Sequence, residues 1–182
     1  KTDFSFFQTA FLVFRVIWIP LFLAPGGYIR RYHELLGDPD PAVHGPAARA
    51  WTTWEAATST LLPDQDHIDK VQDPAFATAF ARIENHFFIH RGWMEDGQLI
   101  AGADVLAAHQ IPGTIVQGRY DIPCPMGTAW ALHRAWPQAE LVVTPASGHA
   151  LSEPETLSAL LEATDRMARL GRPTPAGPAP AP

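Results

Sequence analysis

The stretch Ile111-Pro-Gly-Thr-Ile-Val-Gln-Gly-Arg-Tyr-Asp121 decides the fold, together with its echo Glu140-Leu-Val-Val-Thr-Pro-Ala-Ser-Gly-His149. Each is a short apolar run with β-branched residues at its centre, followed by small residues and one titratable side chain, which is typical of a buried strand and its loop. Between them, residues 125–136 show helical spacing of apolar side chains, and Pro125 suits a first helical turn. Strand, helix and strand over roughly thirty residues predict a βαβ unit with parallel strands.

Asp121 and His149 each follow the carboxyl end of one of these predicted strands. Parallel strands of one sheet end at the same edge, where open α/β sheets bind ligands. Neighbouring strands lie about 4.8 Å apart, so we expect the carboxylate and the imidazole to meet. Such an aspartate holds the histidine's tautomer and stabilises the imidazolium that forms when the histidine accepts a proton. The order Asp then His is also the end of the Ser…Asp…His order of α/β-hydrolases.

Longer motifs carry a family resemblance that covers roughly residues 28–169. They are Ile111-Pro-Gly-Thr-Ile-Val-Gln-Gly-Arg-Tyr-Asp-Ile-Pro-Cys-Pro125 with Ala129-Trp-Ala-Leu-His133, Ala135-Trp-Pro-Gln-Ala-Glu140, Gly148-His149, Arg49-Ala-Trp-Thr-Thr-Trp-Glu55 and Ala81-Arg-Ile-Glu-Asn-His-Phe-Phe88. Together these resemble the proline iminopeptidase (prolyl aminopeptidase) family of α/β-hydrolases. At Gln117 the family pattern often has histidine, a departure that leaves the triad positions untouched.

The resemblance implies an α/β class and a partial α/β-hydrolase fold, with a helical cap followed by the last parallel strands and helices of the sheet. It implies release of N-terminal proline from peptides by a Ser-His-Asp mechanism without a cofactor. Asp121 and His149 would be the catalytic residues of this triad. Glu55 and Glu84 would bind the free amino terminus of the peptide, and Phe88 would line the proline pocket.

Glu55 and Glu84 each lie beside aromatic residues on a predicted helix, Glu55 one turn after Trp51 and Glu84 one turn before Phe88. Two such helices can pack as a hairpin and bring both acids into one aromatic cage, which suits a small ammonium ion on an apolar ring. Cation–π attraction would add about 0.5–2 kcal/mol. Spacing alone favours ordinary boundary glutamates on amphipathic helices, whereas the resemblance favours the binding role. For Phe88, an ordinary core position is a close alternative.

The catalytic candidates also have simpler interpretations. Asp121 can serve as an acid near a helix N-terminus, and His149 can be a loop histidine without a partner. Cys124 lies near Asp121, but a lone cysteine is more often structural, and the family uses serine. His86 and His90 have a metal-compatible i, i+4 spacing, yet no third ligand is convincing and the His-Glu-x-x-His pattern is absent. We expect no metal site.

The printed sequence contains no Gly-x-Ser-x-Gly, the turn on which α/β-hydrolases carry their nucleophile. Ser147 lies only two residues from His149, and its flanks do not suit a nucleophile. The chain therefore resembles a C-terminal fragment of a prolyl aminopeptidase, and we expect it to be inactive alone. The alternatives are another α/β-hydrolase, such as an esterase or an epoxide hydrolase, and a non-catalytic membrane-associated or interaction protein.

The amino-acid composition indicates the class of protein, its partners and its location. Hydrophobic residues make up 47% of the 182 residues and charged residues 18%, as in globular proteins. The formal charge of −6 argues against a nucleic-acid partner. A single cysteine excludes an intrachain disulfide and favours a reducing, cytoplasmic location. Residues 4–24 are apolar, but Arg15 and Pro20 make a membrane span the minority interpretation.

The expected organisation has four parts: residues 1–27 as an apolar segment of uncertain origin, 28–109 as a helical cap region, 110–170 as the C-terminal part of a hydrolase core, and 171–182 as a disordered Pro/Ala tail. Within the cap region, helices are predicted over 28–36, from Pro46, from Pro74 and over 98–109, with a polar connector at 63–73. Ser152 and Glu155 predict a capping box before a last amphipathic helix. Core surface left uncovered by missing strands predicts a partner or poor solubility.

Overall fold

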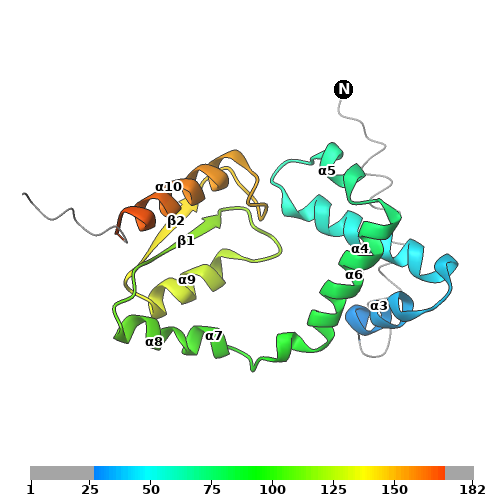
Figure 1. Ribbon diagram of the computed structural model, residues 1–182, viewed down its shortest axis with the longest axis horizontal. Helices are drawn as coiled ribbons and strands as arrows, with labels where there is room; N and C mark the ends of the chain where they lie inside the picture. The colour runs from blue at the N-terminus through cyan, green and yellow to red at the C-terminus, as the bar shows by residue number, and fades with distance from the viewer. Residues whose placement is uncertain (1–26, 171–182) are drawn as a thin grey trace, which may run out of the picture. The chain divides into compact units, whose positions relative to one another are not determined.

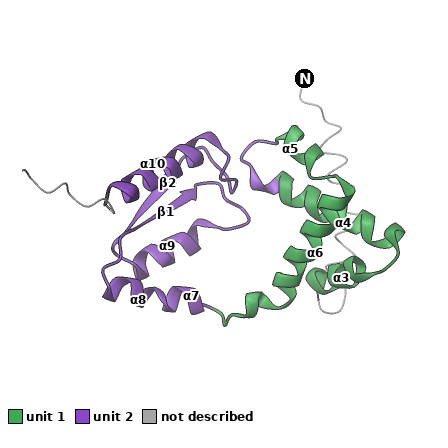
Figure 2. Ribbon diagram, viewed as in Figure 1, with its two compact units in different colours: residues 1–57, 64–96 green, residues 58–63, 97–182 purple. Residues whose placement is uncertain are grey.

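A computed structural model describes residues 27–170, which form helices and a small parallel sheet (Figure 1). The described part of the chain divides into two compact units, residues 27–57 with 64–96 and residues 58–63 with 97–170 (Figure 2). The predicted apolar segment at 4–24 and the predicted tail at 171–182 lie outside the described residues. Among the described residues, none of the helices combines the length and the apolar character that crossing a membrane requires.

The first unit is built from helices. They are α3 (Gly27–Gly37), α4 (Pro41–Ser59), α5 (Gln65–Lys70), α6 (Pro74–Ile89) and the short 3-10 helix η2 (Arg91–Trp93), of which only the last two residues of α4 belong to the second unit. Its core combines two large side chains of α3, Tyr32 and Leu36, with Trp51 of α4 and small alanines. Ala77 and Ala81 of α6 are completely buried, so α6 approaches its neighbours closely along this face.

The second unit contains the predicted βαβ element. Its parts are α7 (Gln98–Ala101), α8 (Ala103–Ala108), β1 (Gly113–Gly118), α9 (Met126–Ala135), β2 (Ala139–Thr144) and α10 (Pro154–Leu170). The strands pair in parallel, with Gly113 opposite Ala139 and Gly118 opposite Thr144, which confirms the predicted strand direction. Helices α9 and α10 each contact both strands and flank the sheet in Figure 1. Mixed helices on a small parallel sheet are compatible with a partial α/β fold.

Several predicted helix boundaries were wrong for local reasons. Helix α4 begins at Pro41 rather than at Pro46, because Pro41 suits a first turn and the Asp40 carboxylate accepts a hydrogen bond from Ala42 N at 2.8 Å. Pro46 therefore lies inside the helix. The expected connector at 63–73 contains α5, which Asp64 caps by accepting from His67 N at 3.0 Å.

Two further corrections concern the second unit. The single helix expected over 98–109 is divided between α7 and α8 at Gly102. The capping box expected between Ser152 and Glu155 does not form, because α10 begins at Pro154 and the Glu155 carboxylate instead accepts from Ala146 N at 2.8 Å. Pro125 precedes α9 as its N-cap rather than lying in its first turn.

Candidate active site

The carboxyl edge of the two-stranded sheet brings two loops together. Residues 118–121 turn directly after β1, with Asp121 N donating to Gly118 O at 3.3 Å. Two backbone hydrogen bonds tie this turn to the end of β2 and to the loop after it: Arg119 N donates to Thr144 O and Tyr120 N donates to Ser147 O, both at 3.0 Å. The side chains that follow the two strands are therefore held on neighbouring backbone segments.

Asp121 and His149 meet at this edge. His149 Nδ1 lies 3.1 Å from Asp121 Oδ2 and 3.2 Å from Oδ1. The Asp121 side chain is only 8% exposed, whereas the His149 side chain is 37% exposed. The pair thus has a buried acid behind an imidazole that remains accessible to solvent, and the arrangement can hold the ring in the tautomer that carries its proton on Nδ1.

Two nitrogen donors fix the Asp121 carboxylate. Cys124 N donates to Oδ1 at 2.7 Å, and Gln117 Nε2 donates to Oδ2 at 3.1 Å. Gln117 is 9% exposed, and its amide also donates to Cys124 O at 2.9 Å. Because hydrogen bonds to an ionised carboxylate are strong and directional, these donors orient Asp121 toward His149.

The backbone of the His149 loop is fixed separately from its side chain. His149 N and Ala150 N both donate to Ser59 O, at 2.8 and 2.7 Å. The Glu153 carboxylate accepts from Gly148 N at 2.5 Å and from Leu61 N at 2.9 Å. A single glutamate therefore joins the His149 loop to the segment 58–63, which belongs to the same unit.

Gly118 permits the close approach of the two loops. A Cβ atom at Gly118 would collide with the carbonyl oxygen of Gly148. Both contact partners are backbone, so neither can rotate away. The end of β1 and the residue before His149 therefore touch only because position 118 has no side chain.

The predicted substrate residues lie in the first unit. Trp51 Nε1 donates to Glu84 Oε2 at 2.5 Å, and the Trp51 ring centroid is 6.0 Å from that of Phe88. Glu55 is partly buried on α4, one turn after Trp51. The structure thus brings Glu84 and Phe88 to Trp51, and this indole also lies on the helix that carries Glu55. Phe88 is 50% exposed, so it is not an ordinary core residue.

The other residues considered as nucleophile or metal ligand lie in both units: Cys124 and Ser147 in the second, and His86 and His90 in the first. Cys124 is exposed on the loop after β1, and its ligand atom lies within 4.8 Å of those of Asp121 and His149. Ser147 is fully buried, and its hydroxyl has no hydrogen-bond partner. The ring centroids of His86 and His90 are 4.8 Å apart in the first unit, and His90 stacks on Trp93.

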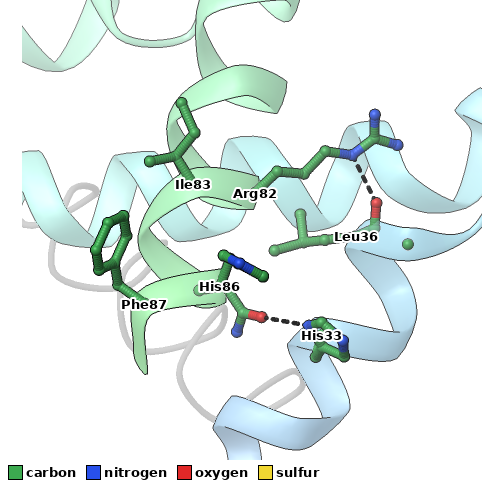
Figure 3. A pocket seen from close by; sticks show the side chains of 8 residues that line it. His33, Leu36, Arg82, Ile83, His86 and Phe87 are labelled. Carbon is green, nitrogen blue, oxygen red and sulfur yellow. Dashed lines mark hydrogen bonds between the residues drawn. The ribbon is translucent and has the colours of Figure 1, made fainter. Parts of the chain in front are cut away.

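A pocket of about 410 Å³ lies between α3 and α6 (Figure 3). It contains none of the predicted site residues. Its lining is mostly apolar, and three of its polar side chains have hydrogen-bond partners: His33 Nδ1 is 3.1 Å from Asn85 Oδ1, and Arg82 Nε donates to Leu36 O at 2.7 Å. The pocket therefore offers few polar groups for specific recognition.

Sequence reasoning missed the supporting residues of the pair. Gln117 was noted only as a departure from a family pattern, although a polar side chain at the end of a buried strand is itself a signal of a partner. Glu153 was not singled out, and Ser59 acts through its carbonyl group. A backbone acceptor leaves no signal in a sequence, because every residue has one.

Fold and site together define an α/β unit with an aspartate–histidine pair at the carboxyl edge of parallel strands. Sequence comparison makes the relationship specific. The chain is 49% identical over 138 residues to the proline iminopeptidase of Xanthomonas citri, covering 75% of this chain and 44% of that protein. It is 50% identical over 139 residues to a probable proline iminopeptidase of Leptolyngbya boryana (76% and 43%) and 44% identical over 140 residues to the proline iminopeptidase of Arabidopsis thaliana (76% and 36%).

The chain is thus related to the proline iminopeptidases and matches their C-terminal part. It spans less than half the length of these curated relatives. No family model matches the chain.

Proposed function

We propose that Asp121 and His149 are the acid and base of a Ser-His-Asp triad in an α/β-hydrolase that releases N-terminal proline from peptides. The observation that carries this proposal is the hydrogen bond between the two side chains, at 3.1 Å, on loops that follow two parallel strands. The identity of 40–50% to proteins named proline iminopeptidase supports the choice of reaction.

In this mechanism Asp121 accepts a hydrogen bond from the N–H at His149 Nδ1, which keeps the proton on Nδ1 and leaves Nε2 unprotonated. Nε2 then accepts the proton of the attacking serine and later donates it to the leaving amine. Asp121 stabilises the imidazolium between these steps. Gln117 and the Cys124 amide serve by keeping the carboxylate in place, since a rotated carboxylate would release the ring.

The same proposal assigns Glu55 and Glu84 to the ammonium group of the substrate and Phe88 to its proline ring. Support comes from the contacts of Trp51, whose indole N–H holds Glu84 and whose ring lies beside Phe88. A carboxylate fixed in this way is oriented before the substrate arrives, which lowers the entropy cost of binding an amino terminus.

The nucleophile is proposed to come from outside the printed sequence, which has no Gly-x-Ser-x-Gly. The chain alone should therefore show no turnover. In this scheme residues 28–109 act as the cap region and 110–170 as the C-terminal part of the hydrolase core. A partner that supplies the remaining core would complete the site. The single cysteine supports a reducing compartment such as the cytoplasm.

The test is a chimera of the Xanthomonas citri enzyme in which the matched C-terminal part is replaced by residues 28–169 of this chain. We expect the chimera to cleave a chromogenic N-terminal proline substrate. The variants Asp121→Asn and His149→Gln should lower kcat by roughly 10⁴-fold, the loss typical of triad members. A folded chimera that cleaves a simple acyl ester but no proline substrate would favour the esterase alternative.

Glu55→Gln and Glu84→Gln in the same chimera test the amine anchor. Each should lower kcat/KM for the proline substrate by roughly 10- to 100-fold, because a hydrogen bond to a charged group is lost. A glutamine oxygen at position 84 can still accept from Trp51, so the fold is retained. Glu140→Gln is the control, since Glu140 pairs only at the surface with Arg166. Unchanged kinetics in both test variants would remove the anchor assignment.

A further inference from the structure

Three side chains of metal-ligand type converge at the carboxyl edge of the sheet. Asp121 and Cys124 come from the loop after β1, and His149 comes from the loop after β2. Their ligand atoms all lie within 4.8 Å of one another. Within residues 27–170 this is the one cluster of three such residues. A carboxylate, a thiol and an imidazole at this spacing are able to surround a single small cation.

The separations fit a tetrahedral metal after a small adjustment. Zinc bonds of about 2.0–2.3 Å place neighbouring ligand atoms about 3.4–3.6 Å apart. The Asp121 and His149 atoms are already 3.1 Å apart. Because no separation in the cluster exceeds 4.8 Å, the ligand atoms need to close by at most about 1 Å. Because Cys124 is exposed, rotation of its side chain can supply this movement.

The ligand set selects the kind of cation. Thiolate and imidazole are ligands of zinc and other thiophilic metals, whereas magnesium and calcium prefer oxygen ligands only. A carboxylate and a thiolate together carry two negative charges, which balance one divalent cation. The Asp121 carboxylate is oriented by Gln117 and by the Cys124 amide, as a carboxylate ligand of a metal commonly is.

Although the sequence led us to expect no metal site, we propose that Asp121, Cys124 and His149 form a binding site for a thiophilic divalent cation, with Zn²⁺ as the representative ligand. The thiol of Cys124 loses its proton to water when the metal binds, and the imidazole binds in its neutral form. Three protein ligands leave a fourth position for water.

The bound cation is an inhibitor rather than a cofactor. Coordination through His149 Nδ1 replaces the hydrogen bond to Asp121, and coordination through Nε2 occupies the nitrogen that would accept the serine proton. Either way the pair can no longer act as a base. This consequence rests on the proposed function, whereas the binding of the cation does not.

Direct binding to the full 182-residue chain separates the two proposals, because it needs no catalytic activity. Zn²⁺ alone is titrated by calorimetry, and Co²⁺ alone is titrated by absorption, where a thiolate ligand gives a charge-transfer band in the near ultraviolet. We expect one equivalent to bind and the band to appear. Cys124→Ser should abolish the band. Cys124→Ser, Asp121→Asn and His149→Gln should each weaken zinc binding at least tenfold, because removing even a residue that only supports a metal ligand lowers the affinity by roughly 10-fold or more.

The double variant His86→Gln/His90→Gln is the matched control, since these rings form the other close histidine pair in the described residues. It should leave binding at the sheet edge unchanged. Circular dichroism of each variant establishes that the fold is retained, and Cys124→Ser is a conservative change at an exposed position. Zinc binding that survives Cys124→Ser, that is lost in the double histidine variant, or that does not occur at all would overturn the proposal.

Discussion

At the scale of single residues, the structure assigns Gln117 a supporting role. Its buried amide donates to both Asp121 Oδ2 and Cys124 O. Gln117→Leu keeps a similar volume but leaves these acceptors without their donor. We expect the free energy of unfolding, measured by urea denaturation, to fall by about 1–3 kcal/mol.

Gln138→Leu provides the control for Gln117, because Gln138 makes one exposed hydrogen bond at 3.3 Å. It should change stability by less than about 0.5 kcal/mol. Gln117→His retains a donor at this position and should lose less stability than Gln117→Leu. Equal losses for the leucine variants at positions 117 and 138 would show that the buried amide has no special role.

Trp51 is the second residue whose contacts allow a sharp prediction. Its indole donates to the Glu84 carboxylate, and its ring meets Tyr32 edge-to-face with centroids 5.0 Å apart. Trp51→Phe keeps an aromatic ring but removes the donor to a charged acceptor. Thermal and urea unfolding should show a loss of about 1.5–3 kcal/mol. Trp130→Phe, at a position that is 52% exposed, should be nearly neutral, and a similar loss there would contradict the assignment.

The meeting of Asp121 and His149 could be predicted because it follows from the topology alone. Once two parallel strands are assigned, the residues after their carboxyl ends lie at one edge. The partners of the pair could not be predicted in the same way. Glu153 reaches the backbone amides of Leu61 and Gly148, and such contacts depend on tertiary packing that no local pattern records.

At the scale of elements, the junction between β1 and the His149 loop depends on the missing side chain at position 118. Gly118→Ala places a methyl group against the Gly148 carbonyl and forces backbone movement. We expect a loss of at least 1–3 kcal/mol, roughly the cost of overpacking, together with an altered His149 environment in NMR spectra.

Gly127→Ala is the matched control for Gly118, since it lies in α9 and an added Cβ meets nothing within 4 Å. Alanine favours the helix over glycine, so this variant should gain about 0.5–1 kcal/mol. Opposite signs for the two substitutions are the expected result. A neutral Gly118→Ala would show that the two loops are not in backbone contact.

The helices show where sequence patterns succeed and fail. The helix predicted from Pro74 does begin there as α6, and the Asp73 carboxylate accepts hydrogen bonds from Ala75 N and Phe76 N at its start. The aromatic side chains Phe76 and Phe87 of α6 are 46% and 51% exposed, whereas Ala77 and Ala81 lie on the buried face of this helix. Caps are local and can be predicted, but the choice of the buried face depends on the neighbouring helices.

At the scale of the whole molecule, the core of the first unit makes the stability of that unit sensitive to pH. The core of the first unit contains Tyr32, which is 1% exposed. Burial raises the pKa of Tyr32 to about 12, because the phenolate is poorly solvated there. An unfolded tyrosine has a pKa of about 10. The stability of the first unit is therefore linked to alkaline pH.

The direction follows from proton counting. Between pH 10 and about 12 the unfolded chain releases the Tyr32 proton while the folded chain keeps it, so the free energy of unfolding falls as pH rises. The folded and unfolded pKa of Tyr32 differ by about two pH units, which corresponds to roughly 2–3 kcal/mol of the free energy of unfolding. This loss of stability is complete near pH 12. Stability measured by urea titration at successive pH values should show this loss in the native chain. Tyr32→Phe should lack this component, whereas Tyr120→Phe, at a position 54% exposed, should retain it. Identical pH profiles for the native chain and Tyr32→Phe would mean that the phenol is not buried in the core of the first unit.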